Sequence, residues 1–381
     1  MKQIVNANIS YLIHLIGCAL DNTIPEELPQ DVTWKDIYQL AKYHSIDNLI
    51  FYSIEKLAKK PDEELYKKWM ESRDKAIFKG ITQLYERDSI IEKLTEAQID
   101  ICPLKGCIIK ELYPSQDMRT MADLDILMDS NKADVVKKVF KEMGYTLDHI
   151  DEEGHDVYKK RPVMNVEMHH YLVPLEVLQD KMLQYYKNVW ERLKVTKDNV
   201  HCYYMSKEDF YIYHIAHMVK HYKLGGTGIR SFIDIYIYKK HYDKLLDWKY
   251  IYDELDKMEI IELAIVFEKI VQAWFQDGII DDEVKQITTY IIASGTYGTL
   301  ERSHKVFMQN KLEKSTNKFT YTIRRIFPSM KEMRKGYTIL YKIPFALPLF
   351  WIYRGIKAFI YKDKRKKIKI EADLIRNKKN E

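Results

Sequence analysis

Hydrophobic positions recur at helical spacing along most of the chain, with one interruption between about residues 99 and 175. Before the interruption, residues 61–97 are charged on one side and apolar on the other, which predicts a single long helix bent near Gly80. Pro25 and Pro29 separate this part into several helices, and Thr33 is placed to cap the helix that follows them. Residues 1–98 are therefore expected to form a helical region.

Between residues 99 and 175 the pattern changes to short apolar runs and alternating segments. Four segments predict strands, and two segments between them resume helical spacing. The strand segments are "IDICPLKG", "DLDILMD" and the pair "DVYKKRP" with "VMNVEMHHYLV", and the helical ones are "CIIKELY" and "NKADVVKKVFKEMGY", which ends at Gly144. This part predicts a compact unit of strands and helices.

Helical spacing returns from residue 176 to about 330, and residues 331–381 form an apolar and then basic tail. The fold class expected is therefore α+β and mostly α overall. A small mixed sheet at 99–175 would lie between the helical regions 1–98 and 176–330, the second of which would close over the sheet.

Composition narrows the class of protein only slightly. A chain of 381 residues with 46% hydrophobic content can bury a sizeable core. The net charge of +5, from 61 basic and 56 acidic residues, allows contact with phosphates or anionic lipid without requiring it. The four cysteines include no CxxC pair and are expected to be small buried side chains in a reducing compartment. Residues 1–22 read as an amphipathic helix rather than a signal peptide, so we expect a cytoplasmic protein.

Two aspartates mark the first candidate for chemistry. Asp123 and Asp125 lie two apart on a predicted strand and would project from the same face. Two adjacent carboxylates repel unless a cation lies between them, and Mg²⁺ (or Mn²⁺) prefers such oxygen ligands together with substrate phosphates. Glu167 and His169 share one face of a later strand. If that strand lies beside the first, Glu167 completes an acidic triad.

Basic residues nearby are suited to phosphate. Lys105 and Gly106 end the preceding strand where a helix would begin, and a glycine there lets backbone amides approach a phosphate. Arg119 offers a planar set of donors for phosphate oxygens. The pattern predicts a site for a metal ion and a triphosphate.

These motifs resemble a known family. The order "LKG", "LYP", Arg119, "DLDIL", "GY" and "VEMHH" is similar to that of the uncharacterised nucleotidyltransferases of the DNA polymerase β superfamily. The resemblance covers about residues 100–172, and more loosely 214–238. It implies that Asp123 and Asp125 bind metal, and that Glu167 is a third metal ligand or the base that activates an acceptor hydroxyl. The reaction implied is attack of that hydroxyl on the α-phosphate of a nucleoside triphosphate, with release of pyrophosphate.

The helical segment after residue 207 leaves alternatives open. His214, His217 and His221 share one helix face, which permits either a zinc site or, as the resemblance favours, a helix lining the cleft. Arg230 and Asp234 lie four apart and would form an ion pair within the helix; alternatively Arg230, with Lys220, reaches the triphosphate or the acceptor. His169, His217 and Asp234 are the other residues expected at the cleft.

The partners stay open as well. The acceptor would be a small molecule, a sugar, a peptide, a protein or RNA. One alternative is a toxin-like enzyme that adds nucleotides to tRNA, and another is a catalytically idle nucleotide-binding scaffold at a membrane surface. Residues 343–369 join an apolar stretch to a basic run that would pack on the protein, lie at a membrane interface or contact nucleic acid.

Overall fold

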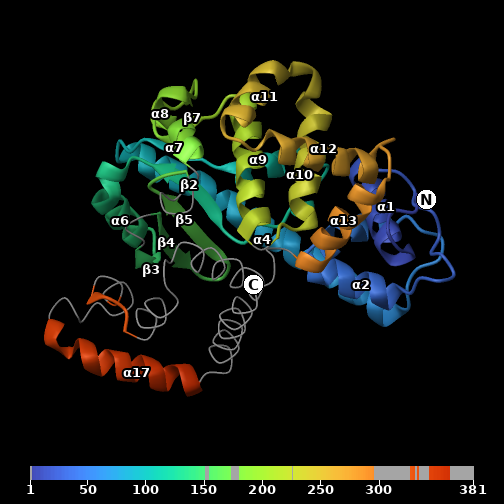
Figure 1. Ribbon diagram of the computed structural model, residues 1–381, viewed down its shortest axis with the longest axis horizontal. Coiled ribbons are helices and arrows are strands. Elements are labelled where there is room, and N and C mark those ends of the chain that lie inside the picture. Colours follow the sequence, from blue (N-terminus) through green and yellow to red (C-terminus); the bar gives the residue numbers. More distant parts are fainter. Residues whose placement is uncertain are drawn as a thin grey trace, which may run out of the picture. The chain divides into compact units, whose positions relative to one another are not determined.

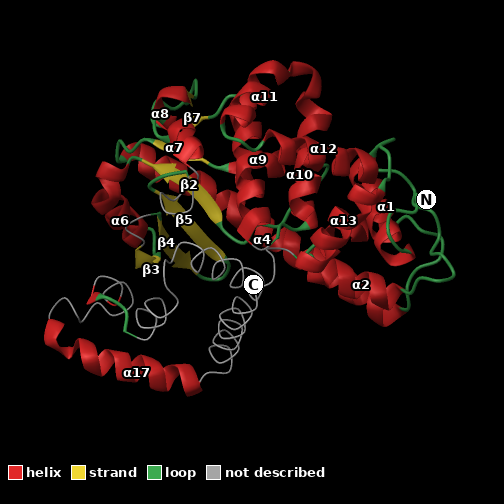
Figure 2. Ribbon diagram, in the orientation of Figure 1, coloured by secondary structure: helices red, strands yellow, loops and turns green. Residues whose placement is uncertain are grey.

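The computed structural model describes residues 2–150, 154–172, 180–224, 226–295, 327–330, 333 and 343–360. The chain divides into two units. The first comprises Met1–Lys220 and Thr227–Thr296, and the second His221–Gly226 and Tyr297–Glu381. The protein is α+β and mostly helical, as predicted; Figure 1 labels its helices and strands, and Figure 2 colours them by type.

Four helices precede the sheet: α1 (Ala7–Asp21), α2 (Trp34–Tyr43), α3 (Asp47–Ile54) and α4 (Glu63–Glu96). Thr33 caps α2, as predicted, because its side chain accepts a hydrogen bond from the Asp36 amide. The long helix α4 is continuous and begins at the cap residue Asp62. Gly80 lies in its middle, where a Cβ atom would come within 3.1 Å of Nζ of Lys110. This glycine therefore makes room for a lysine side chain.

The sheet has five strands in the order β1-β2-β5-β4-β3. Its strands are β1 (Ile101–Pro103), β2 (Leu124–Met128), β3 (Thr146–Ile150), β4 (His155–Lys160) and β5 (Met164–His169). Strands β2 and β5 are parallel and the other neighbours are antiparallel, so the sheet is mixed as expected. Strand β3 was missed by the sequence analysis. It follows α6 (Ala133–Glu142) through Gly144, whose φ of +81° suits glycine.

Short helical pieces connect β1 to β2 and β2 to α6. They are α5 (Lys105–Ile109), η1 (Lys110–Leu112), η2 (Gln116–Met118) and η3 (Ser130–Lys132).

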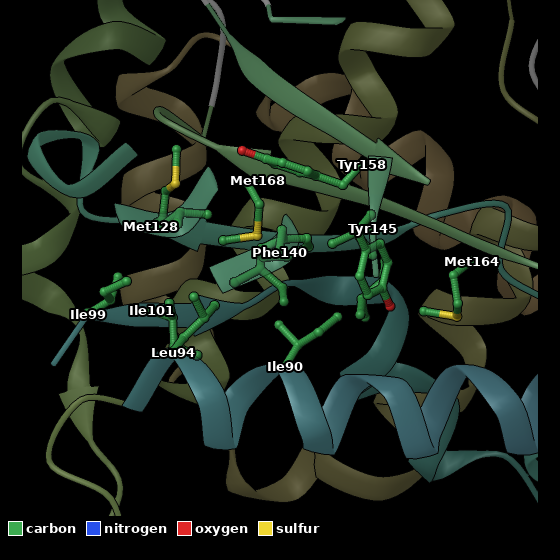
Figure 3. Close-up of a cluster of buried hydrophobic side chains, with 14 of the residues drawn as sticks. Ile90, Leu94, Ile99, Ile101, Met128, Phe140, Tyr145, Tyr158, Met164 and Met168 are labelled. Carbon is green, nitrogen blue, oxygen red and sulfur yellow. The ribbon is translucent and has the colours of Figure 1, made fainter. Parts of the chain in front are cut away.

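One face of the sheet carries the hydrophobic core. Strand residues that alternate with the acids pack against α4 and α6, and Figure 3 shows Ile90 and Leu94 of α4 pointing toward them. The strand side chains include Leu124, Ile126, Met128, Tyr158, Val166 and Met168, all buried. Burial of this face fixes the pairing register of the strands, because a shift of one residue would point the acidic side chains toward the hydrophobic core. The opposite face is therefore the one that carries Asp125 and Glu167.

Helices return after β5, as predicted: α7 (Asp180–Tyr186), α8 (Val189–Arg192), α9 (Lys207–Leu224), α10 (Ile229–Tyr242), η4 (Asp243–Leu245), α11 (Trp248–Lys257), α12 (Ile261–Phe275) and α13 (Asp282–Ser294). A small two-stranded ladder of β6 (Lys194–Val195) and β7 (Tyr203–Tyr204), which the sequence did not predict, interrupts them. The four cysteines are buried and unpaired.

In the second unit, η6 (Pro344–Ala346) leads into α17 (Leu347–Ile360). Trp351 of α17 donates a hydrogen bond from Nε1 to the Pro328 carbonyl at 3.0 Å. Phe345, Leu349 and Ile352 are exposed. The basic run at 362–369 lies outside the described residues. Among the described helices, none combines the length and the apolar character that a membrane crossing requires.

Candidate active site

Two acids from separate strands meet on the face of the sheet opposite the hydrophobic core. In the parallel ladder of β2 and β5, Asp125 is paired with Glu167 and Leu127 with His169. The condition stated for an acidic triad, that the strand of Glu167 lies beside that of Asp125, is met. Ligand atoms of Asp125, Glu167 and His169 all lie within 4.8 Å of one another, which makes them a group able to hold a metal ion.

Two histidines surround these carboxylates. His169 Nε2 lies 3.0 Å from Asp125 Oδ1 and 3.8 Å from Glu167 Oε2. His155, the first residue of β4, is paired with His169 in the antiparallel ladder, and its Nε2 lies 3.5 Å from Glu167 Oε2. His155 was not predicted from the sequence, where its only signal is its position at the start of an alternating segment. The histidines therefore restrict where the two carboxylates can point.

Asp123 immediately precedes β2, and its charge and those of the other two acids influence one another's pKa values. Burial raises the pKa of Asp123, and the negative charge of Asp125 raises it further. The pKa of Glu167 is raised to about 7 by burial and by the charges of Asp123 and Asp125. Burial also acts to raise the pKa of Asp125, but the hydrogen bond and charge of His169 outweigh it, so this pKa is lowered. Three acids thus share a region in which added positive charge would stabilise their ionised forms.

Lys105 lies beside these acids because the chain before it is fixed to β2. The Leu104 amide donates to the Asp125 carbonyl at 2.9 Å, and Lys105 begins α5. Nζ of Lys105 lies 2.6 Å from Nδ1 of His217 on α9. Burial lowers the pKa of Lys105 to about 8, although Asp125 acts in the opposite direction. His217, which was expected at a cleft, therefore lies beside Lys105.

Gly106 follows Lys105 at a point of close packing. A Cβ atom there would lie 3.2 Å from Sδ of Met121 and 3.6 Å from Nη1 of Arg119. The first of these separations is tighter than ordinary van der Waals contact. A side chain at this position would therefore require Met121 to shift by a few tenths of an ångström.

Arg119, predicted to face a phosphate, is engaged with Asp234 of α10. Its Nε and Nη2 atoms donate to the two carboxylate oxygens at 2.8 and 2.7 Å. Tyr113 donates its hydroxyl to Asp234 at 2.7 Å, and all three residues are buried. Asp234, expected at the cleft and alternatively as a partner of Arg230, thus receives its hydrogen bonds from Arg119 and Tyr113.

The two remaining basic residues named from the sequence lie in different places. Burial lowers the pKa of Lys220 on α9, and the negative charge of Glu167 acts to raise it. Lys220 is therefore close enough to Glu167 for the two charges to interact. Arg230 donates from Nη2 to the Ser45 carbonyl at 2.8 Å and to Thr120 Oγ1 at 3.1 Å. Arg230 thus lies next to the segment that leads into Asp123.

The zinc alternative receives no support from the described residues. The group of potential metal ligands found there includes none of the three helix histidines. His214 is buried with Nε2 3.1 Å from the Ser231 carbonyl, and burial lowers its pKa to about 4. His217 faces Lys105.

Lys79 of α4 is a further cation that the sequence analysis missed. Burial lowers its pKa, the charge of Asp123 acts to raise it, and that of Arg230 lowers it further. It is one lysine among many charges on a long helix, so periodicity alone could not identify it.

Comparison with models of protein families gives a match to the family described as "Uncharacterised nucleotidyltransferase" over residues 30–276. The matched segment is more than half of the chain and contains every site residue named above. No curated protein and no solved structure matches the chain.

Proposed function

Because the chain belongs to a family of nucleotidyltransferases, we propose that it transfers a nucleoside monophosphate from a nucleoside triphosphate to a hydroxyl acceptor and releases pyrophosphate. The observation that carries this proposal is the pairing of Asp125 with Glu167 on adjacent parallel strands. The pairing gathers carboxylates on a sheet face that lies away from the hydrophobic core. Acids gathered in this way are suited to a divalent cation and a triphosphate.

The donor set fits Mg²⁺ or Mn²⁺. Carboxylate oxygens are the hard ligands that these ions prefer. The pKa values of Asp123 and Glu167 are raised first by burial and then by the neighbouring carboxylates, and a bound cation would offset the second of these causes. Asp123, Asp125 and Glu167 would hold the metal, although the group of ligand atoms that lie within 4.8 Å of one another contains His169 in place of Asp123. When bound, such ions neutralise the charge that develops on the attacking and leaving oxygens.

The chain's own residues would handle the proton and the phosphate charge. The acceptor oxygen forms a bond to the α-phosphorus while the bond from phosphorus to the pyrophosphate oxygen breaks. The base is the alternative role of Glu167: where it does not hold the metal, its carboxylate, with a pKa of about 7, accepts the acceptor's hydroxyl proton near neutral pH. His169, hydrogen-bonded to Asp125 at 3.0 Å, keeps that carboxylate oriented.

Lys105 would neutralise the phosphates. It begins α5 directly after the segment bonded to the backbone of Asp125, so its charge lies next to the acids. A cation that is already in position when the reaction starts can stabilise the developing negative charge, because no side chain has to move first. Lys220, whose charge interacts with that of Glu167, would bind the same phosphates or the acceptor. Arg119 would act indirectly, since its guanidinium holds Asp234 of α10.

The acceptor is to be identified by labelling. The purified chain would be incubated with Mg²⁺, a cell extract and each of ATP, GTP, CTP and UTP labelled on the α-phosphate. We expect label on an acceptor and release of pyrophosphate. Label on tRNA would favour the toxin-like alternative, and label on a sugar, small molecule, peptide or protein would exclude it. Triphosphate binding without pyrophosphate release in any extract would favour an idle scaffold and contradict the proposal.

A membrane contact is a second, separate proposal for the second unit. Phe345, Leu349 and Ile352 are exposed on the helical segment 344–360, and six lysine or arginine residues follow within 362–369. An apolar helix face next to a basic run is complementary to a surface of anionic lipid. Co-sedimentation with vesicles containing phosphatidylserine, and not with neutral vesicles, is the expected result; equal recovery in both supernatants would contradict it.

A further inference from the structure

A basic pocket lies beside α4 in the first unit, and the proposed chemistry does not use it. Its lining includes three lysines and three hydroxyl groups: Lys42, Ser45, Ser72, Lys75, Lys79 and Thr120. At about 260 Å³ it has room for several water molecules at about 30 Å³ each, and so for a phosphate group. We call it the α4 pocket.

The three lysines differ in how far their charge is compensated. Lys42 donates to Asp47 at 2.9 Å and to Ser72 at 3.2 Å. Lys75 has Glu71 at 3.9 Å. For Nζ of Lys79, the described part of the chain provides no hydrogen-bond acceptor, although the side chain is partly removed from water. Lys79 is therefore the lysine with most to gain from an anion.

A buried lysine adds to this positive charge. Lys110 is 1% exposed, and its Nζ lies beneath Gly80, the residue after Lys79. Its pKa is lowered to about 8, first by burial and then by cations that include Arg119 and Lys79. Asp117 acts to raise this pKa and is the nearby acid, but burial and the neighbouring cations outweigh it, so the region around Gly80 keeps an excess of positive charge.

The pocket opens next to the proposed metal-binding strand. Thr120 lines it and lies three residues before Asp123. Arg230 binds the Ser45 carbonyl and the Thr120 hydroxyl, and so holds together two parts of the pocket wall. The charges of Lys79 and Asp123 also act on each other. A group bound to Lys79 would thus be close to the reacting centre.

We propose that the α4 pocket binds a phosphate group of a substrate, with Lys79 and Lys75 as its cationic ligands and Ser72 and Thr120 as hydroxyl donors. The inference rests on the proposed function, because that function supplies a phosphate-bearing substrate next to Asp123. Two sources have this chemistry: the β- and γ-phosphates of the donor nucleotide, and a phosphate carried by the acceptor. Charge-assisted hydrogen bonds from lysine suit both.

The test measures binding to the full chain by calorimetry in EDTA, so that it depends on neither the metal nor turnover. The probes are a nucleoside triphosphate, inorganic tripolyphosphate, the matching monophosphate and glucose 1-phosphate. Lys79→Gln and Lys75→Gln are compared with Lys68→Gln, an exposed lysine of the same helix that pairs with Glu64. Unchanged melting temperatures establish that the variants are folded.

A donor-phosphate site predicts that Lys79→Gln weakens the triphosphate and tripolyphosphate by about 10-fold or more, but not the monophosphate. An acceptor site predicts the same loss for glucose 1-phosphate alone. Lys68→Gln is expected to bind every probe as the wild type does. The proposal is overturned if Lys79→Gln binds all probes like the wild type, or if the wild type binds none. Failure of the proposed function would show separately, as absence of Mg²⁺-dependent pyrophosphate release from a chain that still binds the probes.

Discussion

Arg119 and Asp234 form a buried ion pair with two hydrogen bonds, of 2.8 and 2.7 Å, across 115 residues of sequence. Arg119 belongs to the segment that leads into Asp123, and Asp234 lies in α10. The pair therefore fixes the start of the proposed metal-binding strand against the helical region. Planar guanidinium groups suit this two-point contact better than lysine does.

Breaking this pair is expected to destabilise the fold. Asp234→Asn leaves the buried guanidinium without a counter-charge, which typically costs about 3–5 kcal/mol. Thermal and urea denaturation of the wild type and the variant would measure the loss. Lys249→Gln is the matched control, because it removes an exposed i,i+4 pair with Asp253 and is expected to change nothing measurable. An Asp234→Asn variant as stable as the wild type would contradict the structural role given to Arg119.

Lys105→Met tests the cation next to the acids. The substitution keeps the length of the buried side chain and removes the charge, so we expect kcat/KM for the nucleotide to fall about 10²–10³-fold with little loss of stability. Steady-state pyrophosphate release and a melting curve provide the two readouts. His217→Gln, which alters the neighbour of Nζ, should have a smaller effect. Equal kcat/KM in Lys105→Met and wild type would exclude Lys105 from phosphate binding.

Glu167 makes the stability of the metal-free protein depend on pH. Its pKa is about 7 in the folded state against an ordinary value of 4.5, so the folded chain binds this proton more tightly than the unfolded chain. The stabilisation from this proton is fully present below about pH 4.5 and is lost as the pH rises through 7.

Glu167→Gln removes that dependence. In EDTA, the variant should melt at a higher temperature than the wild type at pH 8, and the difference should shrink at pH 5. Melting curves at the two values of pH measure it. A constant difference at both would mean that Glu167 does not titrate in this range.

Much of the sheet around the two acids could be predicted from local patterns. The alternation around Asp125 and Glu167 identified two strands and the face that their acids share, and burial of Leu124 and Val166 on the opposite face explains why that pattern is readable. Capping at Thr33 is equally local.

Other features depend on contacts distant in sequence. Arg119 pairs with Asp234 because the fold packs α10 beside it. The two residues are 115 positions apart, so no local pattern in the sequence predicts the contact. Lys79 lies on a helix rich in charged residues, and only the fold brings it near Asp123. Strand β3 carries its apolar residues, Leu147 and Ile150, three apart rather than two, and its pairing with β4 shifts register between Leu147 and His149, so it shows no alternation in the sequence.

The packing of Gly80 leads to a prediction about helix α4. Alanine is usually better than glycine inside a helix by about 1 kcal/mol. At Gly80, however, the added Cβ would meet Nζ of the buried Lys110 at 3.1 Å, so Gly80→Ala should give no gain or a loss in melting temperature. Gly355→Ala in α17 is the control, since a Cβ there meets nothing within 4 Å, and it should increase helicity measured by circular dichroism.

Lys110→Met provides the second half of this experiment. An apolar side chain of similar length avoids the desolvation of a buried ammonium group, so Lys110→Met should raise the melting temperature. Gly80→Ala should also be better tolerated in the Lys110→Met background. Equal effects of Gly80→Ala in both backgrounds would show that the two residues do not interact.

The central claim is that Asp125 acts with Glu167 in metal-dependent nucleotidyl transfer. The most direct measurement is Mg²⁺-dependent release of labelled pyrophosphate by the wild type, Asp125→Asn and Asp134→Asn, with the labelled acceptor followed in parallel. Asp134 is an exposed residue of α6 outside the site. We predict that Asp125→Asn remains folded and loses at least about 10³-fold in rate, while Asp134→Asn matches the wild type. Release of pyrophosphate by Asp125→Asn at the wild-type rate would contradict the account.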